Sequence, residues 1–210
     1  MTQSPFEEFA AEYDNWFETH RFAYQSEVKA VRRFIPPQGV GVEVGVGTGR
    51  FSASFNITIG VEPSEKMAAI ARSRGIDVRI SCAEKLPFGS QSFDFVLMVT
   101  TLCFVENPLL ALQEAVRVLK PNGRLIVAII DKESTLGKKY EAMKASDRFY
   151  EGAKLFSSQE IIKLLEPLGL IMVQSCQTIF SDPETMTAPD VVKEGYGEGA
   201  FVVVSALKMQ

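Results

Sequence analysis

In the segment Val42-Glu43-Val44-Gly45-Val46-Gly47-Thr48-Gly49-Arg50-Phe51, three glycines stand at alternate positions directly after an apolar run. The apolar run predicts a strand over residues 40–44, and the residues near 50–55 predict a helix, so the glycines lie in a strand-to-helix turn. Glycine accepts positive φ and lets a ligand approach where another residue would place a Cβ atom. Because parallel sheets bind ligands at the carboxyl ends of their strands, this turn is a candidate binding site.

The spacing of the glycines separates two kinds of nucleotide-binding turn. The dinucleotide fingerprint G-x-G-x-x-G fails when counted from Gly45, because the sixth position is Arg50. The spacing is instead E-x-G-x-G-x-G, and Glu43 is expected to point its carboxylate toward the mouth of the turn. A carboxylate there suits a cationic ligand and repels a pyrophosphate. The charge therefore favours S-adenosylmethionine (SAM), which carries a sulfonium and an ammonium group.

Strand and helix patterns alternate on both sides of this turn. Strands are predicted at 40–44, 57–61, 78–81, 93–100, 124–130, 170–177 and 200–207. Helices are predicted at 24–34, 50–55, 107–120, 138–145 and 157–168, with a further helix capped by Ser64. The last two strands follow one another without a helix, which favours an antiparallel pair at one edge. We therefore expect an α/β fold with a doubly wound, mostly parallel seven-stranded sheet and an antiparallel edge strand.

The whole chain, 1–210, is expected to form one domain. Its N-terminal segment should be a helical lid, because Ser4 can cap a helix, Pro5 suits the first helical position, Glu7 completes a capping box, and aromatic residues then recur at helical spacing. The expected segments are the N-terminal lid at 1–38, the cofactor-binding core at 39–130, a lid insertion at 131–156, and a helix with two edge strands at 157–210.

Composition and charge limit the classes of partner. The 210 residues are 46% hydrophobic and 23% charged, as in soluble globular proteins, and the net charge of −4 argues against an extended nucleic-acid surface. The N-terminus is acidic and aromatic, and no apolar run is long enough to span a bilayer. Cys82, Cys103 and Cys176 lie far apart, which predicts buried, reduced thiols and no metal site. We expect a cytoplasmic protein that binds neither nucleic acid nor membranes, and the sequence leaves its oligomeric state open.

A second acidic residue follows the next predicted strand, in Ile59-Gly60-Val61-Glu62-Pro63. A carboxylate at this place can accept hydrogen bonds from both hydroxyls of an adenosine ribose. Taken alone, a glutamate at a strand end is commonly a solvated terminus. Its position one strand after the glycine turn favours ribose binding.

Five segments together resemble the class I SAM-dependent methyltransferases, and most of all the branch that contains the ubiquinone- and menaquinone-biosynthesis type and many small-molecule methyltransferases. The segments are 41–51, 61–64 (VEPS), 83–88 (AEKLPF), 92–96 (SFDFV) and 117–123 (RVLKPNG). The resemblance covers residues 39–173 in the order and at the spacings of the family. It implies a Rossmann-like fold, SAM as cofactor and S-adenosylhomocysteine (SAH) as product, and it says little about the acceptor.

The resemblance also implies which residues contact the cofactor. Gly45, Gly47 and Gly49 would pass under its methionine end, Glu43 would help to hold its ammonium group, and Glu62 would bind its ribose. The remaining contacts would come from Pro63 and Met67 near the adenine, from the backbone of Ala83 at the adenine edge, and from Thr100 beside the transferred methyl group.

Two positions depart from the pattern of the family. Cys82 stands where relatives often carry an aspartate that accepts from the adenine amino group, so that Glu84 takes this role or the contact is absent. Cys103-Phe104 stands where relatives often carry a histidine, which removes the most familiar base. No catalytic residue is therefore assigned.

Four residues are candidates for contacts with the substrate. Tyr13 belongs to an N-terminal aromatic stripe that core packing explains as well, and His20 is the only histidine and a candidate proton acceptor. Glu194 and Tyr196 lie in an acidic loop that is either solvated or faces a cationic acceptor. We expect methyl transfer to a small molecule, in particular an amine. The alternatives are a non-catalytic SAM-binding protein and an aminopropyltransferase on the same fold.

Overall fold

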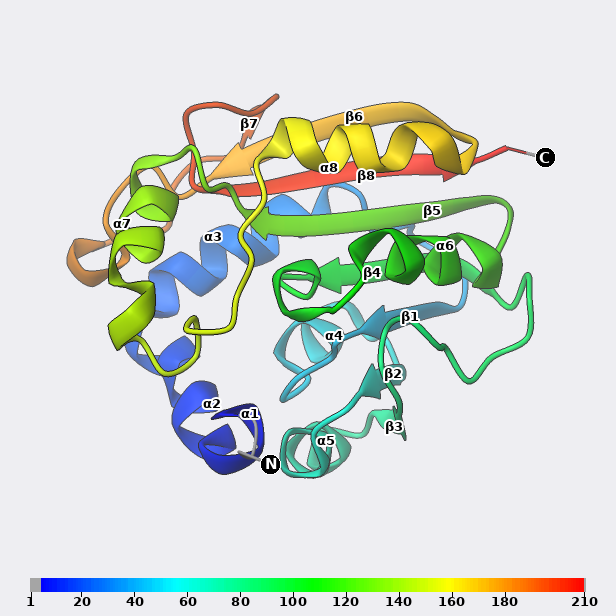
Figure 1. The fold of residues 1–210 in the computed structure, drawn as a ribbon, viewed down its shortest axis with the longest axis horizontal. Helices are drawn as coiled ribbons and strands as arrows, with labels where there is room; N and C mark the ends of the chain where they lie inside the picture. Colours follow the sequence, from blue (N-terminus) through cyan, green and yellow to red (C-terminus); the bar gives the residue numbers. More distant parts are fainter. Residues whose placement is uncertain (1–4, 210) are drawn as a thin grey trace.

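An eight-stranded sheet runs through the middle of the molecule in the order β3-β2-β1-β4-β5-β8-β6-β7 (Figure 1). The computed structural model describes residues 5–209. The strands are β1 (Gly41–Val44), β2 (Ile59–Glu62), β3 (Asp77–Ile80), β4 (Phe93–Val99), β5 (Leu119–Ile130), β6 (Leu170–Thr178), β7 (Lys193–Glu194) and β8 (Phe201–Lys208).

The direction of the strands confirms the predicted mostly parallel sheet. β1 to β5 are parallel to one another, and β8 runs antiparallel to both β5 and β6. The sheet has one strand more than predicted, because β7 adds a two-residue ladder to Cys176 and Gln177 of β6. A strand of two residues is too short to show a periodicity in the sequence.

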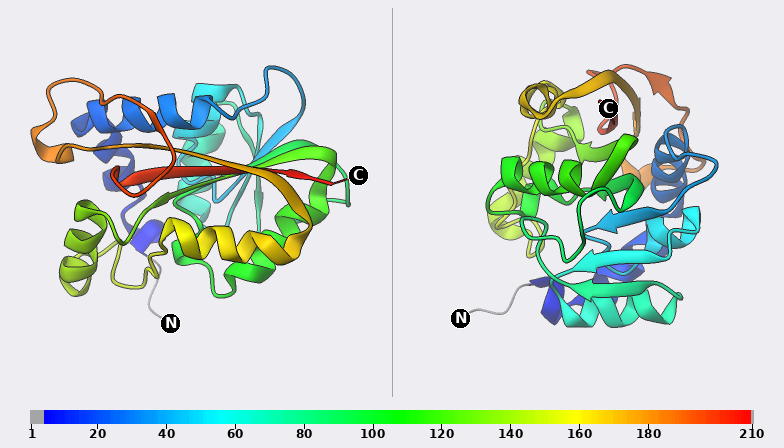
Figure 2. Two further views of the ribbon diagram at one scale, coloured as in Figure 1. Left: turned by 90° about the horizontal axis from the view of Figure 1, so that it is seen from above. Right: turned by 90° about the vertical axis from the view of Figure 1, so that its right-hand side faces the viewer.

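Helices cover both faces of the sheet. In Figure 2, α3 and α4 lie on one face, while α6 and α8 lie on the other. Each pair of helices buries its own apolar cluster against the strands, and α5 packs on β2 and β3. The helices are α1 (Pro5–Glu8), α2 (Ala10–Thr19), α3 (Arg21–Arg32), α4 (Arg50–Phe55), α5 (Glu65–Ser73), α6 (Pro108–Val118), α7 (Thr135–Met143) and α8 (Ser158–Leu165). Short 3-10 turns lie at Leu102–Phe104, Lys144–Ser146, Glu166–Leu168 and Pro183–Thr185.

Several local predictions need correction. The predicted capping residue Ser4 lies outside the described residues, and the Glu7 carboxylate accepts a hydrogen bond from Ser64 Oγ at 2.6 Å, so that it supports the start of α5. The helix predicted at 24–34 already begins at Arg21, so that only His20 separates it from α2. Cys82 is exposed, unlike the two other thiols, because it follows β3 at the rim of a cavity.

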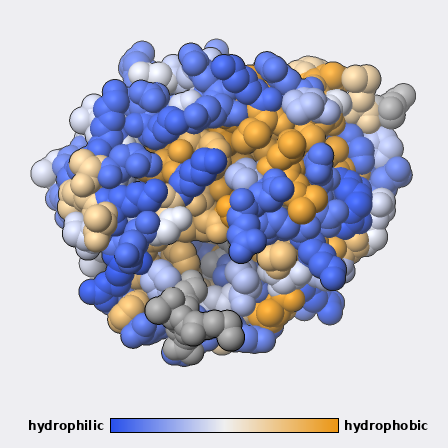
Figure 3. All heavy atoms as spheres, in the orientation of Figure 1, coloured by the Kyte–Doolittle hydropathy of each residue, from blue (hydrophilic) through white to orange (hydrophobic). Residues whose placement is uncertain are grey.

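The parallel strands all deliver their carboxyl ends to one side of the molecule. The arrowheads of β1, β4 and β5 point toward the side where α1, α2 and α7 lie (Figure 1). In the same orientation the surface is hollowed beside these strand ends, and apolar side chains gather over the face formed by α6 and α8 (Figure 3). Among residues 5–209, no helix is both long and apolar enough to cross a membrane.

Candidate active site

The glycines of the turn after β1 have different surroundings. All three take positive φ: +71° at Gly45, +55° at Gly47 and +84° at Gly49. A Cβ atom on Gly49 would lie 2.5 Å from Ile76 Cδ1, so this glycine allows α4 to pack closely against its neighbours. A Cβ atom on Gly47 would reach no heavy atom nearer than Met67 Cε at 3.8 Å. Gly47 therefore leaves space for a ligand rather than for a packed side chain.

Glu62 ends β2 with its carboxylate held by the backbone of the turn. Its Oε2 accepts from the Gly47 N–H at 2.9 Å, and its Oε1 accepts from the Ser64 N–H at 3.0 Å. Burial raises the pKa of Glu62, and these two hydrogen bonds counteract the rise. A carboxylate offers about four acceptor sites, so two remain for the hydroxyl groups of a ribose.

A cavity of about 480 Å³ opens over the turn, and we name it the turn cavity. Its volume suits a small-molecule ligand. Eight of the ten residues predicted to contact the cofactor line it, which are Gly45, Gly47, Glu62, Pro63, Met67, Ala83, Glu84 and Thr100. Glu84 is already engaged through Oε1, which accepts from the backbone N–H groups of Glu106 and Asn107. Cys82 also lines this cavity.

Glu43 and Gly49 do not line the turn cavity. The Glu43 carboxylate is only 2% exposed and accepts from Ser52 Oγ of α4 at 2.5 Å. It therefore points toward α4 and not, as predicted, toward the mouth of the turn. Burial raises the pKa of Glu43 to about 8, although the hydrogen bonds from Ser52 lower it in part. The sequence places Glu43 at the right strand end, but the packing of α4 decides where its side chain points.

A second cavity of about 460 Å³ lies next to the first, and we name it the aromatic cavity. Helices α2, α3 and α7, the segment around Phe149 and the loop after β6 contribute its walls. Its aromatic lining consists of Tyr13, Trp16, Phe17, Phe51, Tyr140, Phe149 and Tyr150. Tyr13, Val99 and Thr100 line both cavities, so the two spaces adjoin at the carboxyl end of β4.

Thr100 has an unusual backbone conformation at this junction. Its φ is +49°, although a β-branched residue in the left-handed region is a genuine outlier. The Thr100 N–H donates to the Ala128 carbonyl at 2.8 Å, which continues the β4–β5 hydrogen bonding beyond the strand. Backbone strain of this kind concentrates at binding and catalytic sites.

Carboxylates outnumber cations in the lining of the aromatic cavity. Three ion pairs connect its wall segments: His20 Nε2 to Glu184 at 3.1 Å, Lys139 to Asp182 at 3.0 Å, and Arg148 to Glu12 at 3.0 Å. Glu27, on α3, is 6% exposed and also lines the cavity. Burial raises the pKa of Glu27 to about 8.

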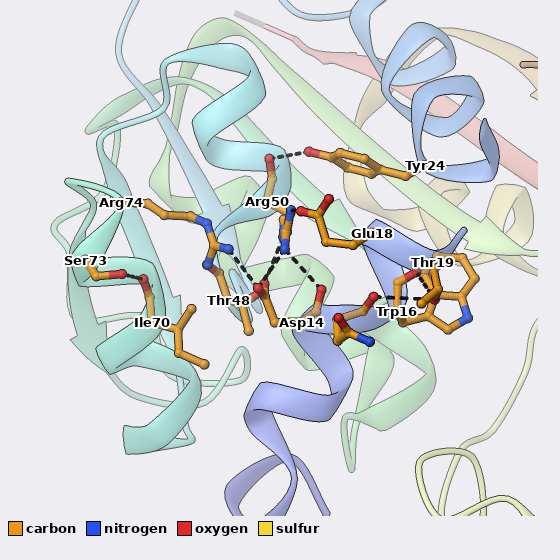
Figure 4. Close-up of polar contacts among 11 residues, drawn as sticks. Asp14, Trp16, Glu18, Thr19, Tyr24, Thr48, Arg50, Ile70, Ser73 and Arg74 are labelled. Atoms are coloured by element: carbon orange, nitrogen blue, oxygen red, sulfur yellow. Dashed lines mark hydrogen bonds and ion pairs between the residues drawn. The ribbon is translucent and has the colours of Figure 1, made fainter. Parts of the chain in front are cut away.

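An ion-pair network attaches α2 to the body of the protein (Figure 4). Asp14 Oδ2 accepts from Arg50 Nη2 at 2.7 Å and from Arg74 Nη2 at 2.8 Å, while Asp14 Oδ1 accepts from Arg50 Nε at 2.9 Å. Arg50 also pairs with Glu18. Because Tyr13 precedes Asp14, this network helps to position a residue that lines both cavities.

The structure brings together only some of the predicted substrate residues. Tyr13 and His20 line the aromatic cavity, whereas Glu194 and Tyr196 line neither cavity. The Glu194 side chain is 89% exposed and lies 3.6 Å from Arg33. It lies outside the cavities because β7 pairs onto the outer edge of β6, whereas the first part of the loop, around Asp182, lines the aromatic cavity.

Other lining residues were not predicted. They include Glu27, Tyr140, Tyr150, Asp182 and Glu184. The sequence contains a sign of Glu27, because this charged residue stands where helical spacing predicts burial beside Ala23, Ala30 and Val31. It contains no such sign of Tyr140 and Tyr150, since the segment after β5 has no strong periodicity.

Comparisons with known proteins agree with this architecture. The model of a methyltransferase domain matches residues 42–127. An uncharacterised protein of Methanocaldococcus jannaschii is 48% identical over 204 residues, which are 97% of this chain and 98% of that protein. A demethylmenaquinone methyltransferase of Tropheryma whipplei is 40% identical over 95 residues, which are 41% of this chain and 39% of that protein.

A solved structure extends the similarity to the whole fold. The crystal structure of a SAM-dependent methyltransferase from Thermotoga maritima, described as a possible histamine N-methyltransferase, is 52% identical to this chain. The two structures match with a TM-score of 0.94 over 97% of this chain and 98% of the other. The chain therefore belongs to the class I SAM-dependent methyltransferases and is an enzyme that takes its methyl group from SAM.

Proposed function

We propose that this enzyme methylates a small-molecule amine that occupies the aromatic cavity. One observation carries the proposal: the aromatic cavity adjoins the turn cavity at Tyr13, Val99 and Thr100. An acceptor in one cavity therefore faces a cofactor in the other across the end of β4. Holding two reactants in this way supplies much of the rate enhancement of a displacement reaction.

The turn cavity is the proposed site of SAM. The free acceptor sites of Glu62, the open space above Gly47 and the volume of the cavity all suit an adenosyl amino acid. When bound, SAM supplies an electrophilic methyl group on its sulfonium. Glu62 would hold the ribose, and Met67 and Ala83 would border the adenine. Glu43 lies beneath the turn, and we propose that it supports the turn through Ser52.

The nature of the aromatic cavity supports a cationic acceptor. Its lining combines aromatic rings, which attract cations through their faces, with five carboxylates: Glu12, Glu27, Asp147, Asp182 and Glu184. A nucleic-acid acceptor would meet these carboxylates with its phosphates. The Thermotoga neighbour carries the description of a possible histamine N-methyltransferase, which is consistent with an amine acceptor.

The protein must also keep the reactants together and exclude water. We propose that the N-terminal helices and the segment 131–156 act as lids, since both contribute walls to the aromatic cavity. The ion pairs of Arg148 with Glu12 and of Lys139 with Asp182 connect these walls. A cytoplasmic location is part of the proposal, supported by three free cysteines in the described chain.

Methyl transfer from labelled SAM tests this function directly. The acceptor panel consists of histamine, phenethylamine, tryptamine and unmodified tRNA, and SAH formation is measured alongside. We expect SAH formation that depends on at least one amine and no transfer to tRNA. Transfer to tRNA alone, or to none of the four, would contradict the proposed acceptor class.

A further inference from the structure

One charged residue interrupts the buried face of α3. The residues of this helix that are buried are Ala23, Ser26, Glu27, Ala30 and Val31. Glu27 is the only ionisable member of this buried set, and it lines the aromatic cavity. A carboxylate in such surroundings is strongly destabilised unless an opposite charge or hydrogen-bond donors meet it.

No protein group meets this carboxylate. Within the described part of the chain, Glu27 makes no hydrogen bond, and none of the ion pairs includes it. The cations in the cavity wall are already engaged, since Lys139 pairs with Asp182 and Arg148 with Glu12. His20 likewise pairs with Glu184. The buried polar side chains of folded proteins are overwhelmingly hydrogen-bonded, so Glu27 is an exception that requires an explanation.

Three tyrosines surround the same space. Tyr13, Tyr140 and Tyr150 line the aromatic cavity, and the rings of Tyr140 and Tyr150 stack with their centroids 4.9 Å apart. Their hydroxyl groups, too, form no hydrogen bond with residues 5–209. Burial and then the negative charge of Glu27 raise the pKa of both Tyr13 and Tyr140.

We propose that Glu27, with the hydroxyl groups of Tyr13, Tyr140 and Tyr150, binds the cationic nitrogen group of the methyl acceptor. This inference rests on the proposed function insofar as the acceptor occupies the aromatic cavity. An ammonium group offers three N–H donors and a full positive charge, which match one carboxylate and neighbouring hydroxyl oxygens. Because an ammonium nitrogen has no free electron pair, it must give up one proton, which the Glu27 carboxylate can accept, before it forms a bond to the methyl group and SAH leaves. The aromatic rings that line the same cavity can add a favourable cation–π contribution. A neutral or anionic acceptor would leave the carboxylate without a partner.

Binding to the SAH complex tests this site without requiring turnover. Phenethylamine and tryptamine are titrated calorimetrically into the protein saturated with SAH, and their neutral analogues 2-phenylethanol and tryptophol are titrated in parallel. Wild-type protein should bind at least one amine more tightly than its alcohol. Glu27→Gln should weaken the binding of that amine about 10- to 100-fold, the range expected for a charge-assisted hydrogen bond. The affinities for the alcohol and for SAH should not change.

Matched variants separate recognition from folding. Tyr150→Phe removes only a hydroxyl group and should weaken the binding of the amine by a smaller factor, about 3- to 10-fold. Tyr24→Phe is its control, because the Tyr24 hydroxyl bonds the Arg50 carbonyl and the residue lines neither cavity. Glu194→Gln is the control for Glu27→Gln, since it also removes one carboxylate but on exposed β7.

The two proposals fail in different ways. The inference about Glu27 is overturned when wild-type protein binds no amine, or when Glu27→Gln binds the amine as tightly as wild type does. An amine that binds through Glu27 but receives no methyl group would support the recognition site and overturn only the proposed acceptor class. Equal binding of amine and alcohol by the wild type would also contradict a cation-binding site.

Discussion

At the scale of single residues, Gly47 and Gly75 provide a matched pair that tests the turn cavity. Both take positive φ, and a Cβ atom would meet no close neighbour at either, but only Gly47 lines the cavity. Gly47→Ala and Gly75→Ala therefore carry a similar backbone strain of about 1 kcal/mol. Only the first also places a methyl group where the cofactor is proposed to lie. We expect calorimetry to show SAH binding weakened at least about tenfold in Gly47→Ala and unchanged in Gly75→Ala. Equal affinities in the two variants would place the cofactor elsewhere.

At the scale of elements, the attachment of α2 depends on the pairing of Asp14 with two arginines. Burial would raise the pKa of Asp14, but hydrogen bonds from Arg50 and Arg74 outweigh it and lower the pKa to about 2. This contribution to stability is therefore present above the unfolded-state pKa near 3.8 and is lost as the pH falls toward 2. At pH 7, Asp14→Asn should lower the unfolding temperature and speed limited proteolysis within α1 and α2. Asp77→Asn breaks an exposed pair with Arg79 and should change neither, since such pairs contribute little. Proteolysis of α2 at the wild-type rate in Asp14→Asn would refute the anchoring role.

At the scale of the whole molecule, the buried carboxyl groups determine how stability depends on pH. Glu27 and Glu43 have pKa values raised to about 8 by burial, so the folded protein binds more protons than the unfolded chain between about pH 4.5 and 8. The free energy of unfolding should therefore fall as the pH rises through this range.

Glu27→Gln removes one of the two groups and should unfold at a higher temperature than wild type at pH 8.5. This difference in unfolding temperature between variant and wild type should shrink toward zero at pH 5. Each kcal/mol of unfolding free energy corresponds to about 2–4 °C for a chain of this length. Thermal unfolding without ligand at pH 5, 7 and 8.5 and constant ionic strength checks this, with Glu194→Gln as control. A difference that does not vary with pH would contradict the assignment of the raised pKa to Glu27.

The amino-acid sequence by itself determined the layers of the fold, the strand-to-helix turn and the acidic residue after β2. These features depend on local patterns: the apolar run before Gly45, the alternation of strands with helices, and the fixed distance from the turn to Glu62. Such patterns involve residues that are close together in the sequence, so they can be recognised without the structure.

Only the tertiary structure decided the second cavity and the direction of individual side chains. Packing of α4 turned Glu43 toward Ser52, and the pairing of β7 with β6 carried Glu194 away from the strand ends. Glu27 lies more than 100 residues before Tyr140 and Tyr150 in the sequence, and no local pattern connects it to them. Their convergence follows from how the N-terminal helices and the segment after β5 pack over the carboxyl ends of the strands, which is a property of long-range contacts rather than of any stretch of the chain.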